Sequence, residues 1–144
     1  GDYSVDGFDG PGGFSVERKS LEDCFSTIIS DRARFERELV RLQRYAFRAL
    51  VIEASLRDVL AYTSPASTGI SDAQRASRPA TVINSLATYA IEYGLHVFYT
   101  DRDRSCAAAL VLRLAERFVR FRARMLEEPV PSHDPLDTAL GGAA

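Results

Sequence analysis

Lysine is nearly absent from this chain. Lys19 is the only lysine among its 18 basic residues, and all the others are arginines. Lysine differs from arginine in carrying a compact, strongly hydrated charge, which suits it to hold a water molecule or a phosphate oxygen beside a metal ion. A single lysine also arises by chance in an arginine-rich composition, so the residues around Lys19 must show whether it has a function.

Cysteines and long apolar runs are scarce too. The two cysteines, Cys24 and Cys106, have no CxxC partner and no histidine nearby, which argues against a zinc site or a disulfide framework. Both lie in apolar helical patterns, so we expect two buried thiols. No apolar stretch approaches the roughly 18 residues that a membrane span requires, and no signal segment opens the chain, so we expect no membrane partner.

The chain has no excess of positive charge. Its net charge is -2 at pH 7, so nucleic-acid binding would have to come from a local basic patch. With 144 residues, 46% of them hydrophobic, the chain is long enough for one domain with a core and short for two. We expect this domain to cover residues 1–127, and residues 128–144, which lack a core pattern, to form a tail or linker.

A glycine-rich stretch lies near the start of the chain. Residues 6–13 (DGFDGPGG) contain four glycines and one proline. The stretch lacks the GxxxxGK[ST] spacing of a phosphate-binding loop and leads into a strand-like segment instead of a helix. We therefore expect a turn that joins a strand at residues 2–6 to a second strand at residues 14–18.

The remainder of the chain alternates between strand-like and helix-like patterns. Val51 and Ile52 lie in a near-continuous apolar run, typical of a strand that is buried on both faces. The patterns predict strands at residues 46–54 and 95–100, helices at residues 20–29, 32–45, 55–62, 79–93 and 101–127, and a surface loop at residues 63–77. This order favours an α/β fold with a mixed central sheet that helices cover on both faces.

Acidic residues flank Lys19. Strand alternation places Glu17 and Lys19 on the same face, and pairing of the first two strands would bring Asp2 towards Glu17. Carboxylate oxygens suit Mg²⁺, and a neighbouring lysine can orient an attacking water or offset charge on a phosphate. This is the arrangement of metal-dependent nucleases, although acidic residues at this spacing also occur by accident.

A basic stripe follows on the helix expected at residues 32–45. Its arginines recur at intervals of three and four, namely Arg34, Arg37, Arg41 and Arg44. They are either a solvated face paired with Glu36 and Glu38 or a contact surface for nucleic acid. A second group of arginines occupies the last helix, where positive charge also favours the helix C-terminus.

A longer pattern joins these residues. GDYS at residues 1–4, VERKSLED at residues 16–23 and the helix that contains Arg34-Phe35 together resemble the XPF-type structure-specific endonuclease domain (ERCC4 domain), with its GDY turn and ERKxxxD signature. The resemblance extends over about residues 1–124. It implies a restriction-endonuclease-like fold and Mg²⁺- or Mn²⁺-dependent hydrolysis of DNA phosphodiester bonds at branches, flaps or junctions. It also implies a DNA-associated protein that can form a homodimer. We expect this protein in the cytoplasm, or in the nucleus if the organism is a eukaryote.

The resemblance assigns a role to individual residues. Asp2 and Glu17 would bind the metal ion. The catalytic signature would comprise four charged residues, Glu17, Arg18, Lys19 and Asp23, with Lys19 near the attacked phosphate. Arg34 would contact the DNA backbone, and we expect the same of two further arginines on its stripe, Arg37 and Arg41.

The sequence also departs from this family. The family carries an Asp-x-Arg-Glu strand ahead of the GDY turn, so we expect the domain here to lack its first strand. An active endonuclease is the first hypothesis, and a catalytically inactive module that binds DNA or a partner nuclease as a scaffold is the second. The intact Asp2 and ERK residues favour the first, because a scaffold would not require them. A small-molecule α/β enzyme is disfavoured, since no GxGxxG motif and no nucleophile with a base is found.

Overall fold

The protein is an α/β domain built on a three-stranded sheet. The computed structural model describes residues 2–65 and 69–127. The strands are β1 (Phe14–Ser20), β2 (Phe47–Glu53) and β3 (His96–Tyr99), in the spatial order β1-β2-β3. The helices are α1 (Leu21–Ile29), α2 (Arg32–Leu42), α3 (Leu56–Ala61), α4 (Asp72–Tyr93) and α5 (Arg104–Glu127).

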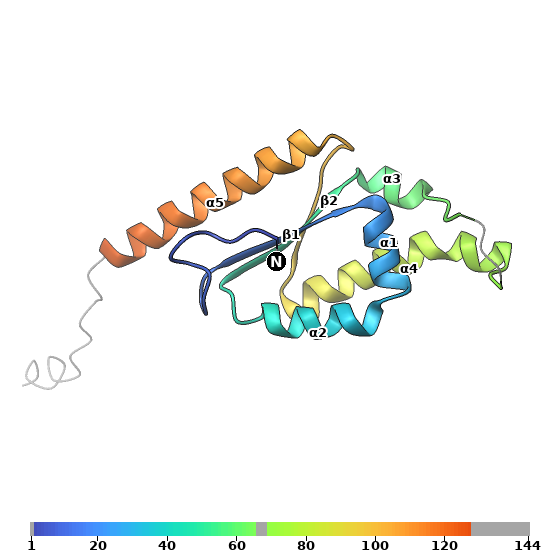
Figure 1. The fold of residues 1–144 in the computed structure, drawn as a ribbon, viewed down its shortest axis with the longest axis horizontal. Helices are drawn as coiled ribbons and strands as arrows, with labels where there is room; N and C mark the ends of the chain where they lie inside the picture. The colour runs from blue at the N-terminus through green and yellow to red at the C-terminus, as the bar shows by residue number, and fades with distance from the viewer. Residues whose placement is uncertain (1, 66–68, 128–144) are drawn as a thin grey trace, which may run out of the picture.

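Helices cover both faces of the sheet, as expected. α5 lies along one face, and α1, α2 and α4 lie on the other (Figure 1). Val51 of β2 packs towards Ala107 and Val111 of α5, whereas the neighbouring Leu50 and Ile52 pack into the core formed with α1, α2 and α4. The continuous apolar run of β2 therefore reflects a central strand with no solvent-facing side.

The three strands are all parallel, where a mixed sheet was expected. Among the described residues, antiparallel pairing occurs as one isolated bridge, in which Tyr3 and Val16 exchange two backbone hydrogen bonds of 3.0 Å. Residues 2–6 are thus not a strand, because the chain turns away at once: the N–H of Phe8 donates to the carbonyl of Val5. The predicted pairing of residues 2–6 with β1 is nevertheless present at this one bridge.

Aromatic packing fixes the glycine-rich turn against the sheet and α5. The ring of Phe118 lies 5.6 Å from that of Phe8 and 5.5 Å from that of Phe14, measured between centroids. Gly13 is needed at the end of the turn, since a Cβ there would lie 1.7 Å from the carbonyl oxygen of Phe8. The turn is thereby tied to the same aromatic cluster as β1.

α4 begins earlier than the sequence indicated. It starts at Asp72, so the predicted loop over residues 63–77 is too long and Pro79 lies inside the helix. Ser71 and Gln74 form a capping box, in which each side chain accepts a hydrogen bond from the backbone N–H of the other. The first turns of α4 show no helical spacing of apolar residues, and proline is typical of the first turn of a helix. The sequence pattern therefore places the start of this helix at Pro79, which is too late.

The cysteines lie in different environments. Cys24 is fully buried, and burial raises the pKa of its thiol to about 12, although the nearby charge of Lys19 acts in the opposite direction. The thiol of Cys24 is therefore neutral at physiological pH. Cys106 is exposed in the first turn of α5, so the expectation that both thiols are buried is wrong for Cys106.

The outer limits of the domain were also predicted from the sequence. The expected tail at residues 128–144 lies outside the described residues, so that boundary stays a prediction.

In the described parts of the chain, every helix is too short or too polar to cross a membrane.

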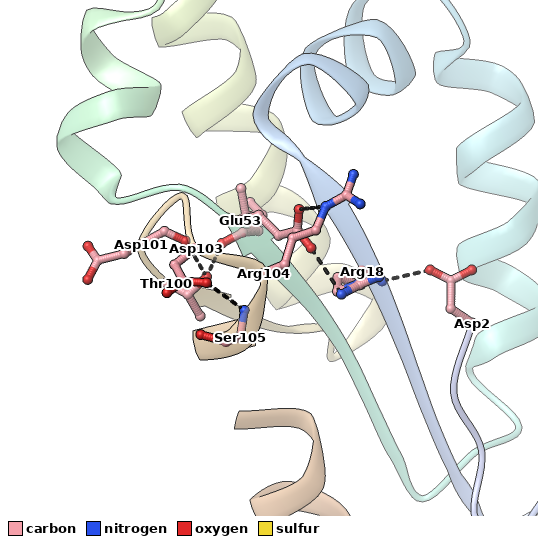
Figure 2. Close-up of polar contacts among 9 residues, drawn as sticks. Asp2, Arg18, Glu53, Thr100, Asp101, Asp103, Arg104 and Ser105 are labelled. Atoms are coloured by element: carbon pink, nitrogen blue, oxygen red, sulfur yellow. Dashed lines mark hydrogen bonds and ion pairs between the residues drawn. The ribbon is translucent and has the colours of Figure 1, made fainter. Parts of the chain in front are cut away.

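A buried carboxylate joins the ends of two strands to α5. Glu53, the last residue of β2, is only 9% exposed. Its Oε1 lies 3.2 Å from Nη1 of Arg18 on β1, and its Oε2 lies 3.8 Å from Nε of Arg104 on α5 (Figure 2). The side chain of Arg18 is 27% exposed and that of Arg104 is 82% exposed, so Arg18 is the partner that compensates the buried charge.

This asymmetry predicts unequal losses of stability. Arg18→Ala leaves the Glu53 carboxylate buried without its close partner and should lower the free energy of unfolding by about 3 kcal/mol. Arg104→Ala removes a solvent-exposed partner and should cost less than about 1 kcal/mol. Urea denaturation followed by circular dichroism measures both values. Equal losses for the two variants would contradict the assignment of Arg18 as the principal partner.

Candidate functional site

Glu17 and Lys19 lie on the face of β1 that looks towards α1 and α2. Phe14 and Val16 pack on the α5 side, so alternation along the strand turns Glu17 and Lys19 to the opposite side. Nζ of Lys19 lies 3.1 Å from Oε1 of Glu17, and the two side chains are 15% and 13% exposed. The predicted sharing of a face is confirmed, and the pair is a half-buried ion pair.

The ammonium group of Lys19 is held against α2. It lies 5.6 Å from the centroid of the Phe35 ring, over the aromatic face. Phe35 is itself buried in the core, so the ring beneath Lys19 is fixed by packing. A lysine held by a carboxylate on one side and a ring on the other loses much of its rotamer freedom, which places its charge at one point of the surface.

A cleft of about 160 Å³ opens beside this pair. β1 contributes Glu17 and Lys19 to its lining. The helices and the turn between them supply the other lining residues, which are Thr27, Asp31, Arg34, Phe35 and Glu38. Three carboxylates and two cations therefore surround one small polar cavity at the point where β1 meets α1 and α2.

Asp2 lies at the free edge of β1. Its Oδ2 accepts a hydrogen bond of 3.1 Å from the backbone N–H of Arg18, directly after Glu17 (Figure 2). The predicted fold-back thus brings Asp2 beside the signature residues. Its carboxylate does not line the cleft of Glu17 and Lys19, and its side chain is solvent-exposed.

Arg18 and Asp23, the other two signature residues, lie outside the cleft. Arg18 points to the opposite face of β1, where it pairs with Glu53 and lies over the ring of Tyr3 at 5.6 Å. Asp23 is exposed in the first turn of α1, and its backbone N–H donates to Oγ of Ser20, the N-cap of this helix. Their chemical roles stay predictions.

The basic stripe of α2 divides between the cleft and the open surface. Arg34 lines the cleft beside Glu17 and Lys19. Arg37 and Arg41 are exposed further along α2, and at about 100° per residue the three lie within about 60° of one another. The stripe thus leads away from the cleft along one helix face. Within the described residues none of the three forms an ion pair, and Glu36 pairs with Arg32 instead.

Two acidic residues of the cleft were not identified from the sequence as site residues. From the sequence, Asp31 is expected only to separate two helices, and Glu38 is expected only to pair with arginines of the basic stripe. Helical spacing offered the missing signal: Glu38 follows Arg34 by four residues and therefore shares its face. Asp31 joins them because the turn between α1 and α2 places it beside the end of β1.

The carboxylates present fit a hard divalent cation in their chemistry. Mg²⁺ binds through one or two carboxylates and keeps water or substrate phosphate as its other ligands, so Asp2 and Glu17 are suitable donors. In residues 2–65 and 69–127 no group of three or more acidic, histidine or cysteine side chains is arranged to hold a metal ion by itself.

Comparisons with known proteins bear on the fold and the family of this chain. The fold resembles that of XPF from Aeropyrum pernix, with a TM-score of 0.54 and 18% sequence identity over 81% of this chain. The match covers 50% of that protein's chain, so the present chain spans about half of its length. A comparison with curated proteins finds no similar sequence. The family model of the ERCC4 domain matches residues 1–113, which contain the whole sheet and the cleft, and the chain therefore belongs to the ERCC4 domain family.

Proposed function

We propose that this domain is a divalent-metal-dependent DNA endonuclease that hydrolyses phosphodiester bonds at branched or flap DNA. The observation that carries the proposal is the Glu17–Lys19 pair on the cleft face of β1, with Asp2 at the edge of the same strand. Membership of the ERCC4 domain family supports it. Mg²⁺ or Mn²⁺, held by Asp2 and Glu17, would supply an activated water and offset charge on the phosphate.

The chain's own side chains contribute binding and charge. Lys19 donates a hydrogen bond to a non-bridging oxygen of the attacked phosphate, and its fixed ammonium offsets the negative charge that develops there. Arg34 lies across the same cleft and contacts the neighbouring backbone phosphate. Arg37 and Arg41 extend that contact along α2. The DNA backbone therefore runs from the end of β1 along the basic stripe.

A catalytically inactive scaffold is the second candidate function. The observation that favours it is the engagement of the metal-binding candidates within the protein: Glu17 pairs with Lys19, and Asp2 accepts a backbone hydrogen bond. Such a module would bind DNA or a partner nuclease through the same stripe without cutting. Absence of cleavage by a protein that carries an Asp-x-Arg-Glu strand ahead of Gly1 would support this alternative.

A cleavage assay separates the two. Flap and fork DNA should be cut in Mg²⁺ or Mn²⁺. Glu17→Gln, which weakens a proposed metal ligand, and Lys19→Ala, which removes positive charge beside the reacting phosphate, should each slow cutting by about 10²–10³-fold. Glu22→Gln, an equal change of charge on the exposed side of α1, serves as the matched control and should cut normally. Equal cutting by all four proteins would reject the site assignment.

We further propose that the domain forms a homodimer through α5. Leu112, Val119 and Leu126 are 60%, 37% and 84% exposed and recur every seven residues. Ala108 lies four residues before Leu112, and Ala115 lies between Leu112 and Val119, which gives the a/d spacing of a coiled-coil seam. A hollow of about 270 Å³ adjoins this end of the seam. Two copies of α5 would bury these side chains against each other.

Light scattering during size-exclusion chromatography tests the dimer. The expected mass is about twice the 15.9 kDa of one chain. Leu112→Glu places a charge on the seam and should yield the monomer, whereas Leu60→Glu, at an exposed leucine of α3, should leave the mass unchanged. A monomeric wild-type protein at micromolar concentration would contradict the proposal.

A further inference from the structure

α5 carries a second basic surface, separate from the cleft and from α2. It consists of Arg113, Arg117, Arg120 and Arg124, here called the α5 basic face. A helix turns by about 100° per residue, so these four arginines lie within about 60° of one another. They extend over about 16 Å of helix at 1.5 Å per residue. α5 lies on the side of the sheet opposite to α2 (Figure 1).

Helix electrostatics do not explain this surface. Positive charge is favourable only within the last turn of a helix, and of the four only Arg124 lies there. Arg113, Arg117 and Arg120 follow one another at intervals of four and three, where like charges repel and destabilise a helix. Within the described residues, Arg113 alone of the four forms an ion pair, with Glu116 at 3.2 Å. Most of this charge is therefore uncompensated.

The orientation of the face is fixed by packing. Phe118 packs against Phe8 and Phe14, and the guanidinium of Arg122 lies 6.0 Å from the centroid of the Phe8 ring. These contacts lie on the side of α5 that faces the sheet, so the α5 basic face points away from it. Arg117, Arg120 and Arg124 line a hollow of about 400 Å³ together with Ala123.

We propose that the α5 basic face binds the phosphate backbone of duplex DNA. The proposal rests on the proposed DNA substrate and adds a second, sequence-independent contact on the far side of the sheet. Guanidinium groups match the geometry of phosphate oxygens, and a length of about 16 Å corresponds to roughly five phosphates of one strand at about 3.4 Å each. Bound phosphates relieve the repulsion between neighbouring arginines.

Fluorescence anisotropy with a short labelled duplex tests the proposal. EDTA is present, so binding is measured without cleavage. Arg117→Gln combined with Arg120→Gln should weaken binding roughly 10-fold, and should lower the slope of log affinity against log salt by about 2, because two phosphates then keep their counterions. Arg57→Gln combined with Arg75→Gln removes the same charge from α3 and α4 and should leave the slope unchanged. Arg117→Lys combined with Arg120→Lys should restore it.

Three results would overturn the proposal. They are an unchanged slope in the α5 glutamine variant, equal weakening in the control variant, and competition by polyglutamate as strong as by DNA of equal charge, which would indicate an acidic protein partner. Thermal unfolding of each variant confirms that it is folded. Absence of cleavage with retained, α5-dependent binding would reject nuclease activity and leave this surface intact.

Discussion

The candidate site depends on how β1 is buried. One face of β1 packs against α5 and its neighbouring strand β2 is buried, while the other face of β1 carries the charged residues Glu17 and Lys19. Parallel pairing with β2 fixes its register, and α5 covers the face that contains Phe14 and Val16. Alternation then leaves no freedom in where Glu17 and Lys19 point. A shift of one residue in this pairing would bury both charges under α5, so the register that builds the core also builds the cleft.

The same constraint separates the residues of the ERK signature. Glu17 and Lys19 share the cleft, whereas Arg18 lies on the other face and neutralises the buried Glu53. A buried carboxylate is costly unless it is paired, so Arg18 has a structural reason to be present that is independent of chemistry. It also links the signature to α5 through Glu53 and Arg104. Adjacent residues of one motif therefore line the cleft and stabilise the fold on opposite sides of one strand.

Features that depend on residues close together in the chain could be predicted from the sequence. The apolar run around Val51, the helix that begins near residue 20 and the shared face of Glu17 and Lys19 depend on neighbours in the chain, and the structure confirms them. Features that depend on contacts between distant segments were not readable. Asp31 reaches the cleft through the turn between α1 and α2, Glu53 pairs with Arg18 across the sheet, and the polar start of α4 offers no apolar period.

The central proposal is that Asp2 and Glu17 bind a divalent metal ion beside β1. Nuclear magnetic resonance of the isotope-labelled protein during titration with Mn²⁺ tests it directly, because the paramagnetic ion broadens signals of nearby amides. We expect early broadening of the amides of Glu17, Arg18 and Lys19, abolished in Glu17→Gln and kept in Glu22→Gln. Broadening confined to other regions, or unchanged in Glu17→Gln, would contradict the metal site.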